Sequence, residues 1–136
     1  MATVNVTLAI QAQGGPQMSV SRPLEVQAYD RVAVTVDPGG AAASEVAVDL
    51  QPSGADRVSI LAIQSSLYGK EIVYRLNDGA TDSDPVQLDQ PQVFVGNAIA
   101  LFGVAPRTLK VKNTFPAADA TKKAQIEVFV GRRATA

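Results

Sequence analysis

Apolar and polar residues alternate along most of the chain, and the clearest alternation covers residues 2–12. One parity there carries only apolar side chains, namely Val4, Val6, Leu8, Ile10 and Ala12. Successive side chains of a β-strand point to opposite faces, so this pattern predicts a strand with one buried face. The following Gln13-Gly14-Gly15-Pro16 predicts a turn.

The middle of the chain, residues 57–76, predicts two strands covered on both sides. Residues 60–63 are apolar on both parities, which is typical of a strand buried on both faces. Gly69 interrupts the run, and alternation resumes with Ile72, Tyr74 and Leu76 on one parity. We expect two antiparallel strands paired in the middle of a sheet. A buried helix is the alternative for so short an apolar run, but serines at 59, 65 and 66 break helical periodicity.

Further strands are predicted at regular intervals through the rest of the chain. They cover residues 18–28, 32–36, 44–50, 86–88, 109–113 and 126–130, and a covered strand kinked at Gly96-Asn97 covers 93–102. A turn or a bulge is expected at 29–31, and turns are expected at 37–40, 52–56 and 77–80. The one plausible helical turn lies within 116–123. Eight to ten short strands, roughly 8–12 residues apart, predict an all-β fold. We expect a single antiparallel β-sandwich domain over residues 1–136, with jelly-roll connectivity as one form of it and residues 132–136 as a short tail.

The composition excludes several kinds of catalytic and metal site. The 136 residues include no Cys, His or Trp. Thiolate nucleophiles, Ser-His triads and Cys/His zinc sites therefore cannot form. The 13 acidic residues single out no pair for acid–base catalysis. We expect a protein that is not an enzyme and uses no cofactor or metal.

Two features bear on localisation. The N-terminal residues lack a basic segment followed by an apolar block, so no secretory signal is predicted. The most apolar run, residues 98–105, is much shorter than the ~20 residues of a membrane-spanning helix. We expect a soluble protein made in the cytoplasm.

Charge is distributed unevenly along the chain. Residues 1–21 contain no charged side chain, whereas an exposed edge strand normally carries charge, Pro or a bulge that blocks pairing. The first strand is therefore either covered within the domain or pairs with another subunit. In the second case the contact residues are Thr3, Asn5, Thr7 and Gln11.

The C-terminal segment is basic, although the formal charge of the chain is only −1. Residues 1–106 hold 5 Lys/Arg and 11 Asp/Glu, a net of −6, and residues 107–136 hold 7 and 2, a net of +5. These charges either mix in space on folding or form a basic patch for an acidic protein partner. The candidate contacts are Lys122, Lys123, Arg132 and Arg133. A pI near 5.3 disfavours nucleic acid as the partner.

A ligand-binding module is the alternative reading of the same chain. Four aspartates, Asp78, Asp82, Asp84 and Asp89, lie close together in the sequence and could supply oxygens to calcium, although their spacing is not that of an EF-hand. They could equally cap their own turns. Tyr29 and Tyr68 lie near predicted turns and are the aromatic candidates for a carbohydrate site.

The chain resembles the small virion proteins of tailed bacteriophages, such as capsid decoration proteins and tail components. The resemblance rests on the terminal segments LKVKN (109–113) and IEVFVGRRAT (126–135), and on a Cys-free, Ala/Val/Gln-rich β-sandwich pattern. It covers about the last quarter of the chain and carries over no functional residue. It implies a homo-oligomeric structural protein of a virus particle that acts through protein–protein contacts.

Overall fold

The computed structural model describes residues 2–50 and 58–133, and ten strands lie within these ranges. The predicted turn at 52–56 lies outside the described residues. The strands are β1 (Ala2–Gln11), β2 (Gln17–Val26), β3 (Ala28–Val36), β4 (Val46–Asp49), β5 (Val58–Ser65), β6 (Ile72–Asn77), β7 (Val86–Gln87), β8 (Gln92–Val95), β9 (Thr108–Asn113) and β10 (Ala124–Arg132). Three short 3₁₀ helices join some of them: η1 (Gly40–Ala42), η3 (Gly96–Phe102) and η4 (Ala120–Lys122).

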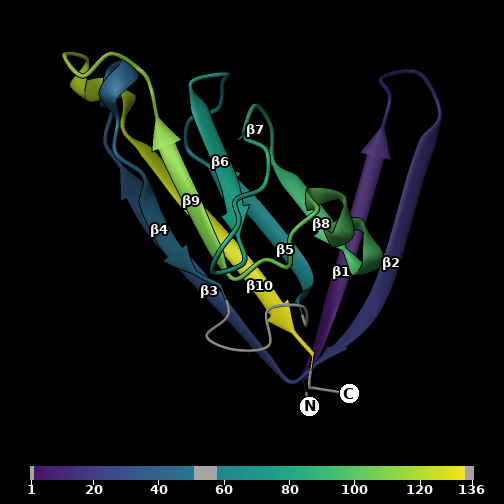
Figure 1. Ribbon diagram of the computed structural model, residues 1–136. Coiled ribbons are helices and arrows are strands. Elements are labelled where there is room, and N and C mark those ends of the chain that lie inside the picture. The colour runs from purple at the N-terminus through teal and green to yellow at the C-terminus, as the bar shows by residue number, and fades with distance from the viewer. Residues whose placement is uncertain (1, 51–57, 134–136) are drawn as a thin grey trace.

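Eight of the strands form two four-stranded antiparallel sheets packed face to face (Figure 1). The strand orders are β3-β10-β5-β8 and β4-β9-β6-β7. The pairs β3·β10, β4·β9, β5·β8 and β6·β7 are nested, so the chain runs out along one strand of each pair and returns along the other. This is the connectivity of a jelly roll, and it confirms the predicted all-β sandwich.

The core lies between the two sheets and is made by the alternating residues of their inner faces. Leu61 and Ile63 of β5, Ile126 and Val128 of β10, and Leu76 of β6 are almost completely buried there. The Tyr74 hydroxyl donates a hydrogen bond to Gln92 Oε1 at 2.5 Å, which satisfies the polar end of the ring. Burial of this phenol raises its pKa well above the ordinary value for tyrosine.

The predicted pairing of the two central strands is wrong, although both strands exist. β5 lies between β10 and β8, and β6 lies between β9 and β7, so the two belong to different sheets. Because β10 and β8 occupy both hydrogen-bonding edges of β5, β5 has no free edge for β6. Residues 66–71 carry the chain from one sheet to the other, and Gly69 adopts a φ of +156° in this segment. Alternation identifies which face of a strand is buried, but it does not identify the neighbouring strand.

The second half of the predicted strand at 93–102 is a 3₁₀ helix instead. Gly96 takes a φ of +63°, which ends β8 and starts η3. A 3₁₀ helix has three residues per turn, so Ile99 and Phe102 lie on the same side and both contribute to the core. The Phe102 ring packs against Phe94 with a centroid separation of 4.7 Å. Leu101 faces away from the core and is 83% exposed.

Two smaller boundary predictions are also corrected. The expected turn or bulge at residues 29–31 is part of β3, where Tyr29 and Arg31 pair across the ladder with Gly131 and Phe129 of β10. Strand β10 extends to Arg132, which sequence reasoning had assigned to a tail. The helical turn expected within 116–123 is confirmed by η4.

Replacement of two leucines by alanine tests the position of the core. We expect Leu76→Ala to lower the free energy of unfolding by about 2–5 kcal/mol, because it leaves a cavity between the sheets. Leu101→Ala makes the same chemical change at an exposed position and should shift stability by less than about 0.5 kcal/mol. Urea unfolding followed by circular dichroism measures both. Equal losses for the two variants would contradict the placement of the core.

Candidate interaction surface

Strands β1 and β2 form a separate two-stranded ribbon, called the arm here, that projects from the jelly roll (Figure 1). Its register runs without a break from Ala2↔Val26 to Gln11↔Gln17. The tip of the arm is a turn in which the Ala12 N–H donates to the Pro16 carbonyl and the Gly15 N–H donates to the Ala12 carbonyl. Gly14 adopts a φ of +68° in this turn. β1 pairs with β2 alone among the described strands, so one backbone edge of each arm strand is open.

The polar face of the arm collects the residues that the sequence predicted as partner contacts. Thr3, Asn5, Thr7 and Gln11 all lie on it and are exposed. Across the ribbon they face Glu25, Pro23, Ser21 and Gln17. Thr7 Oγ1 and Ser21 Oγ lie 3.2 Å apart and share a hydrogen bond. The structure therefore groups these four predicted residues on one surface.

The other face of the arm is apolar and largely uncovered. Val4, Val6, Leu8 and Ile10 lie there opposite Leu24, Arg22, Val20 and Met18. Toward the tip the exposed fractions are high: 46% for Leu8, 51% for Ile10, 57% for Met18 and 44% for Val20. The alternation in residues 2–12 predicted a buried apolar face for the first strand. The apolar face is there, but among residues 2–50 and 58–133 nothing covers it near the tip of the arm.

The base of the arm is fixed to the body by close packing and a backbone hydrogen bond. Val26 is fully buried, and the Gln27 N–H donates to the Arg132 carbonyl at 2.8 Å. Gly131 lies beneath this contact, where an added Cβ would be 2.7 Å from Ile60 Cγ2 and 3.1 Å from Val26 Cγ1. The chain passes from β2 to β3 through the single residue Gln27. The direction in which the arm leaves the body is therefore set by packed residues.

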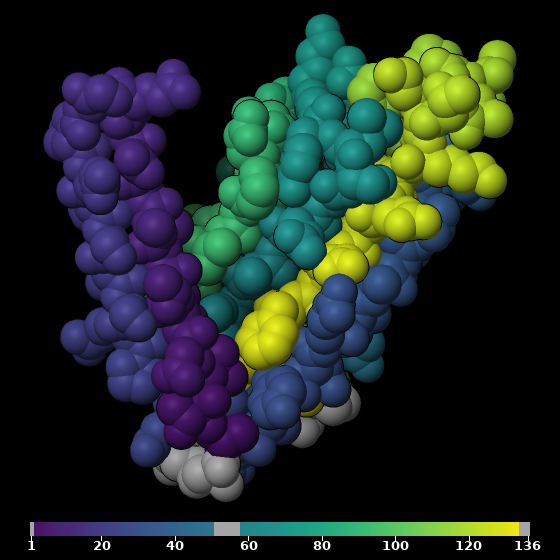
Figure 2. All heavy atoms as spheres, turned by 180° about the vertical axis from the view of Figure 1, so that it is seen from behind, coloured from purple at the N-terminus to yellow at the C-terminus, as the bar shows by residue number. Residues whose placement is uncertain are grey.

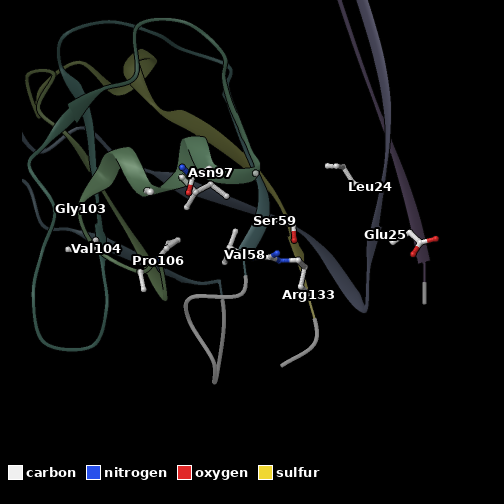
Figure 3. A pocket seen from close by; sticks show the side chains of 13 residues that line it. Leu24, Glu25, Val58, Ser59, Asn97, Gly103, Val104, Pro106 and Arg133 are labelled. Atoms are coloured by element: carbon white, nitrogen blue, oxygen red, sulfur yellow. The ribbon is translucent and has the colours of Figure 1, made fainter. Parts of the chain in front are cut away.

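A cleft separates the arm from the body and is open at its outer end (Figure 2). At the base it becomes a pocket of about 680 Å³ between the arm, the start of β5 and η3. Leu24 projects from the arm toward η3, and Asn97 and Arg133 also line the pocket (Figure 3). Because Leu24 shares a face with Leu8 and Val20, the apolar face of the arm lines the cleft.

One buried polar group beside this pocket has no hydrogen-bond partner among the described residues. The Ser59 hydroxyl is buried within the wall of the pocket, and the residue is 7% exposed. A buried polar atom without a partner is rare in folded proteins and marks a site of strain or of missing contact. Sequence reasoning missed both this pocket and the exposed face of β2. The exposed face of β2 could have been found from the lack of charge, which continues through Ser21.

The four predicted basic contacts do not form one patch. Lys122 and Lys123 lie in and just after η4, near one end of β10, and Arg132 and Arg133 lie at the other end. The Arg132 guanidinium donates to the Leu50 carbonyl and pairs with Asp30 at 2.6 Å, so it is used within the fold. Lys122 lies over the Phe115 ring, and Lys123 is 3.9 Å from Asp37. Much of the basic charge is therefore distributed among local contacts.

Two of the four aspartates in the acidic loop, Asp78 and Asp82, use their carboxylates within the fold, and Asp84 and Asp89 are exposed. Asp78 Oδ1 accepts from the backbone N–H groups of Thr81 and Ala80, and these bonds hold the pKa of Asp78 below its usual value. Asp82 accepts from Asn77 and Lys110, which lower its pKa for the same reason. Within residues 2–50 and 58–133 no group of three acidic side chains is placed to hold a metal ion.

The two tyrosines differ in exposure. The Tyr68 hydroxyl accepts from the Ser65 N–H, and its ring packs partly against the core. Tyr29 is more exposed, and its ring stacks on Phe129 at a centroid separation of 5.8 Å. Tyr29 pairs with Gly131, whereas Ser65, which binds the Tyr68 hydroxyl, pairs with Ile126 toward the other end of β10, so the two rings do not form a common aromatic platform.

Comparison of the chain with protein-family models, curated proteins and solved structures finds no match. Within the described part of the chain, no helix has the length and apolar character needed to cross a bilayer.

The hydrogen bonds of the acidic loop predict its response to calcium. Because Asp78 and Asp82 already accept bonds from the chain, a calcium ion would have to displace them. We expect millimolar calcium chloride to leave the melting temperature unchanged, with magnesium chloride at equal ionic strength as the control. A calcium-specific rise that disappears in Asp82→Asn would show that the loop is a metal site.

Proposed function

We propose that this protein is a non-enzymatic structural protein of a virus particle, a capsid decoration or tail component, that acts through protein–protein contacts. The observation that carries the proposal is the arm. Its tip-proximal side chains Leu8, Ile10, Met18 and Val20 are about half exposed on a ribbon whose first 21 residues carry no charge.

Such a surface is costly unless it is covered in an assembly. A two-stranded ribbon is at best marginally stable by itself in water, because it has no sheet or helix on which to bury its apolar face. Contiguous exposed apolar side chains usually mark an interaction surface. The open backbone edge of β1 also lacks the charges that block pairing with other chains, whereas β2 carries Arg22, Pro23 and Glu25 near the base of the arm. Each of these features favours a partner that binds along the length of the arm.

The jelly roll and the sequence resemblance support the virus particle as the setting. Jelly rolls occur in viral capsid proteins, and also in lectins and cupins. A fold by itself does not specify a function, so this support is by analogy. The resemblance of residues 109–113 and 126–135 to small tailed-phage virion proteins points in the same direction.

Incorporation into particles tests the proposal. We expect the protein to sediment with virus particles purified on a density gradient from the source culture, as detected by antibody or mass spectrometry. Asn5→Lys should reduce incorporation at least severalfold, because it places a charge on the exposed polar face of the arm.

Gln90→Lys provides the matched control, since it adds the same charge at an exposed loop position on the body. It should be incorporated normally. Absence of the wild-type protein from particles would overturn the proposed function. Equal incorporation of both variants would remove the polar face of the arm from the contact.

A further inference from the structure

We propose that the arm binds the arm of a second copy of this chain. In this arrangement, called interlocking here, each arm lies in the cleft between the arm and the body of the other copy. The apolar faces of the two arms pack against each other. The inference rests on the proposed function and names the partner of the arm. The contact is isologous, as in most two-fold dimers.

The arm cannot cover its own apolar face by closing onto its own body. Closure would require the base to move, but Val26 is fully buried there and Gln27 is hydrogen-bonded to Arg132. The Val26 and Ile60 side chains pack directly over Gly131, so a change in the direction of the arm would have to break this packing. The cleft is therefore held open, and cover must come from another molecule (Figure 2).

The apolar face is complementary to itself when two arms run in opposite directions. Matching the exposed rows head to tail sets the Val4/Leu24 row against the partner's Ile10/Met18 row, and the Val6/Arg22 row against Leu8/Val20. Arg22 is the one charged side chain on this face, and the match does not place it opposite a second Arg22. Its long apolar stem can cover the contact while the guanidinium reaches water at the border of the ribbon.

The area available favours interlocking over a simpler contact between arms. The exposed part of the ribbon is about 25 Å long and 10 Å wide, from the usual rise per residue and spacing of strands. Two arms in contact through one face would bury only about 500 Å² in total by this measure. Interlocking also places the polar face of each arm against the partner's body. These two further contacts bring the total to about 1,500 Å², which lies within the usual range for a specific interface.

The pocket at the base of the cleft is suited to receive the tip of the partner's arm. Head-to-tail packing brings the tip, residues 12–16, to the base of the other molecule's cleft. The pocket there has a volume of about 680 Å³, and Leu24, Asn97 and Arg133 are among the residues that line it (Figure 3). The tip offers the Gln13 amide and the peptide groups around Gly14 and Gly15.

Single cysteines test the arrangement directly, because the chain has no cysteine of its own. Leu8→Cys lies on the apolar face near the centre of the proposed contact, and Thr7→Cys lies on the opposite face of the same strand. The purified full-length variants are treated with a short bis-maleimide linker at several protein concentrations. We expect Leu8→Cys to give a covalent dimer and Thr7→Cys to give severalfold less, with sedimentation velocity showing a dimer of the wild-type chain.

A monomeric wild-type chain at all concentrations, or equal cross-linking of the two variants, would overturn the inference. Either result is compatible with a protein that occurs in virus particles, where the arm would then bind a different subunit. Failure of this inference is therefore distinct from failure of the proposed function, which is judged by incorporation.

Discussion

The packing at the base of the arm is the contact on which the surface of this molecule depends. Val26 is buried against Ile60 and Gly131, and the adjacent Gln27 is hydrogen-bonded to the last residue of β10. The same strand, β10, lies between β3 and β5 in the jelly roll. The direction of the arm is thus fixed by a central strand of the fold. A substitution at Gly131 would disturb the base of the arm and the packing of β10 in the jelly roll.

This fixed base explains why an apolar face remains exposed. A ribbon on a flexible connection could fold back onto its own body and bury Leu8 and Val20. Here the connection is one residue long, and the cleft stays open (Figure 2). The hydrophobic effect, about 25 cal/mol for each Å² buried, then favours association with another chain. The function that we propose and the partner that we infer both follow from this constraint.

Sequence reasoning predicted the parts of the fold that depend on local pattern. Alternation predicted strands at 44–50, 109–113 and 126–130, and the structure has strands at 46–49, 108–113 and 124–132, because one face of each packs in the core. It did not identify partners, so residues 58–65 and 72–77 were paired although they belong to different sheets. It also could not distinguish an apolar 3₁₀ helix from a strand at 96–102, since Ile99 and Phe102 are buried in either case.

The candidate surface was predictable only in part. Lack of charge in residues 1–21 indicated an unusual segment, and the four polar contacts on β1 do lie together. Exposure of the apolar face depends on the angle at which the arm leaves the body, and no local pattern encodes that angle. For the basic residues, the prediction grouped side chains that the fold separates. Their proximity in sequence suggested one patch, but β10 separates Lys123 from Arg132 by its full length.

The salt dependence of association tests the central claim most directly, because the arm is almost free of charge. Light scattering gives the molar mass of the purified chain as concentration rises, at low and at high sodium chloride. Association through the arm predicts a mass above that of one chain that high salt maintains or increases. A contact between the basic segment and an acidic neighbour would weaken as salt screens the charges. A single-chain mass under all conditions, or an assembly that high salt dissociates, would contradict association of two copies through their arms.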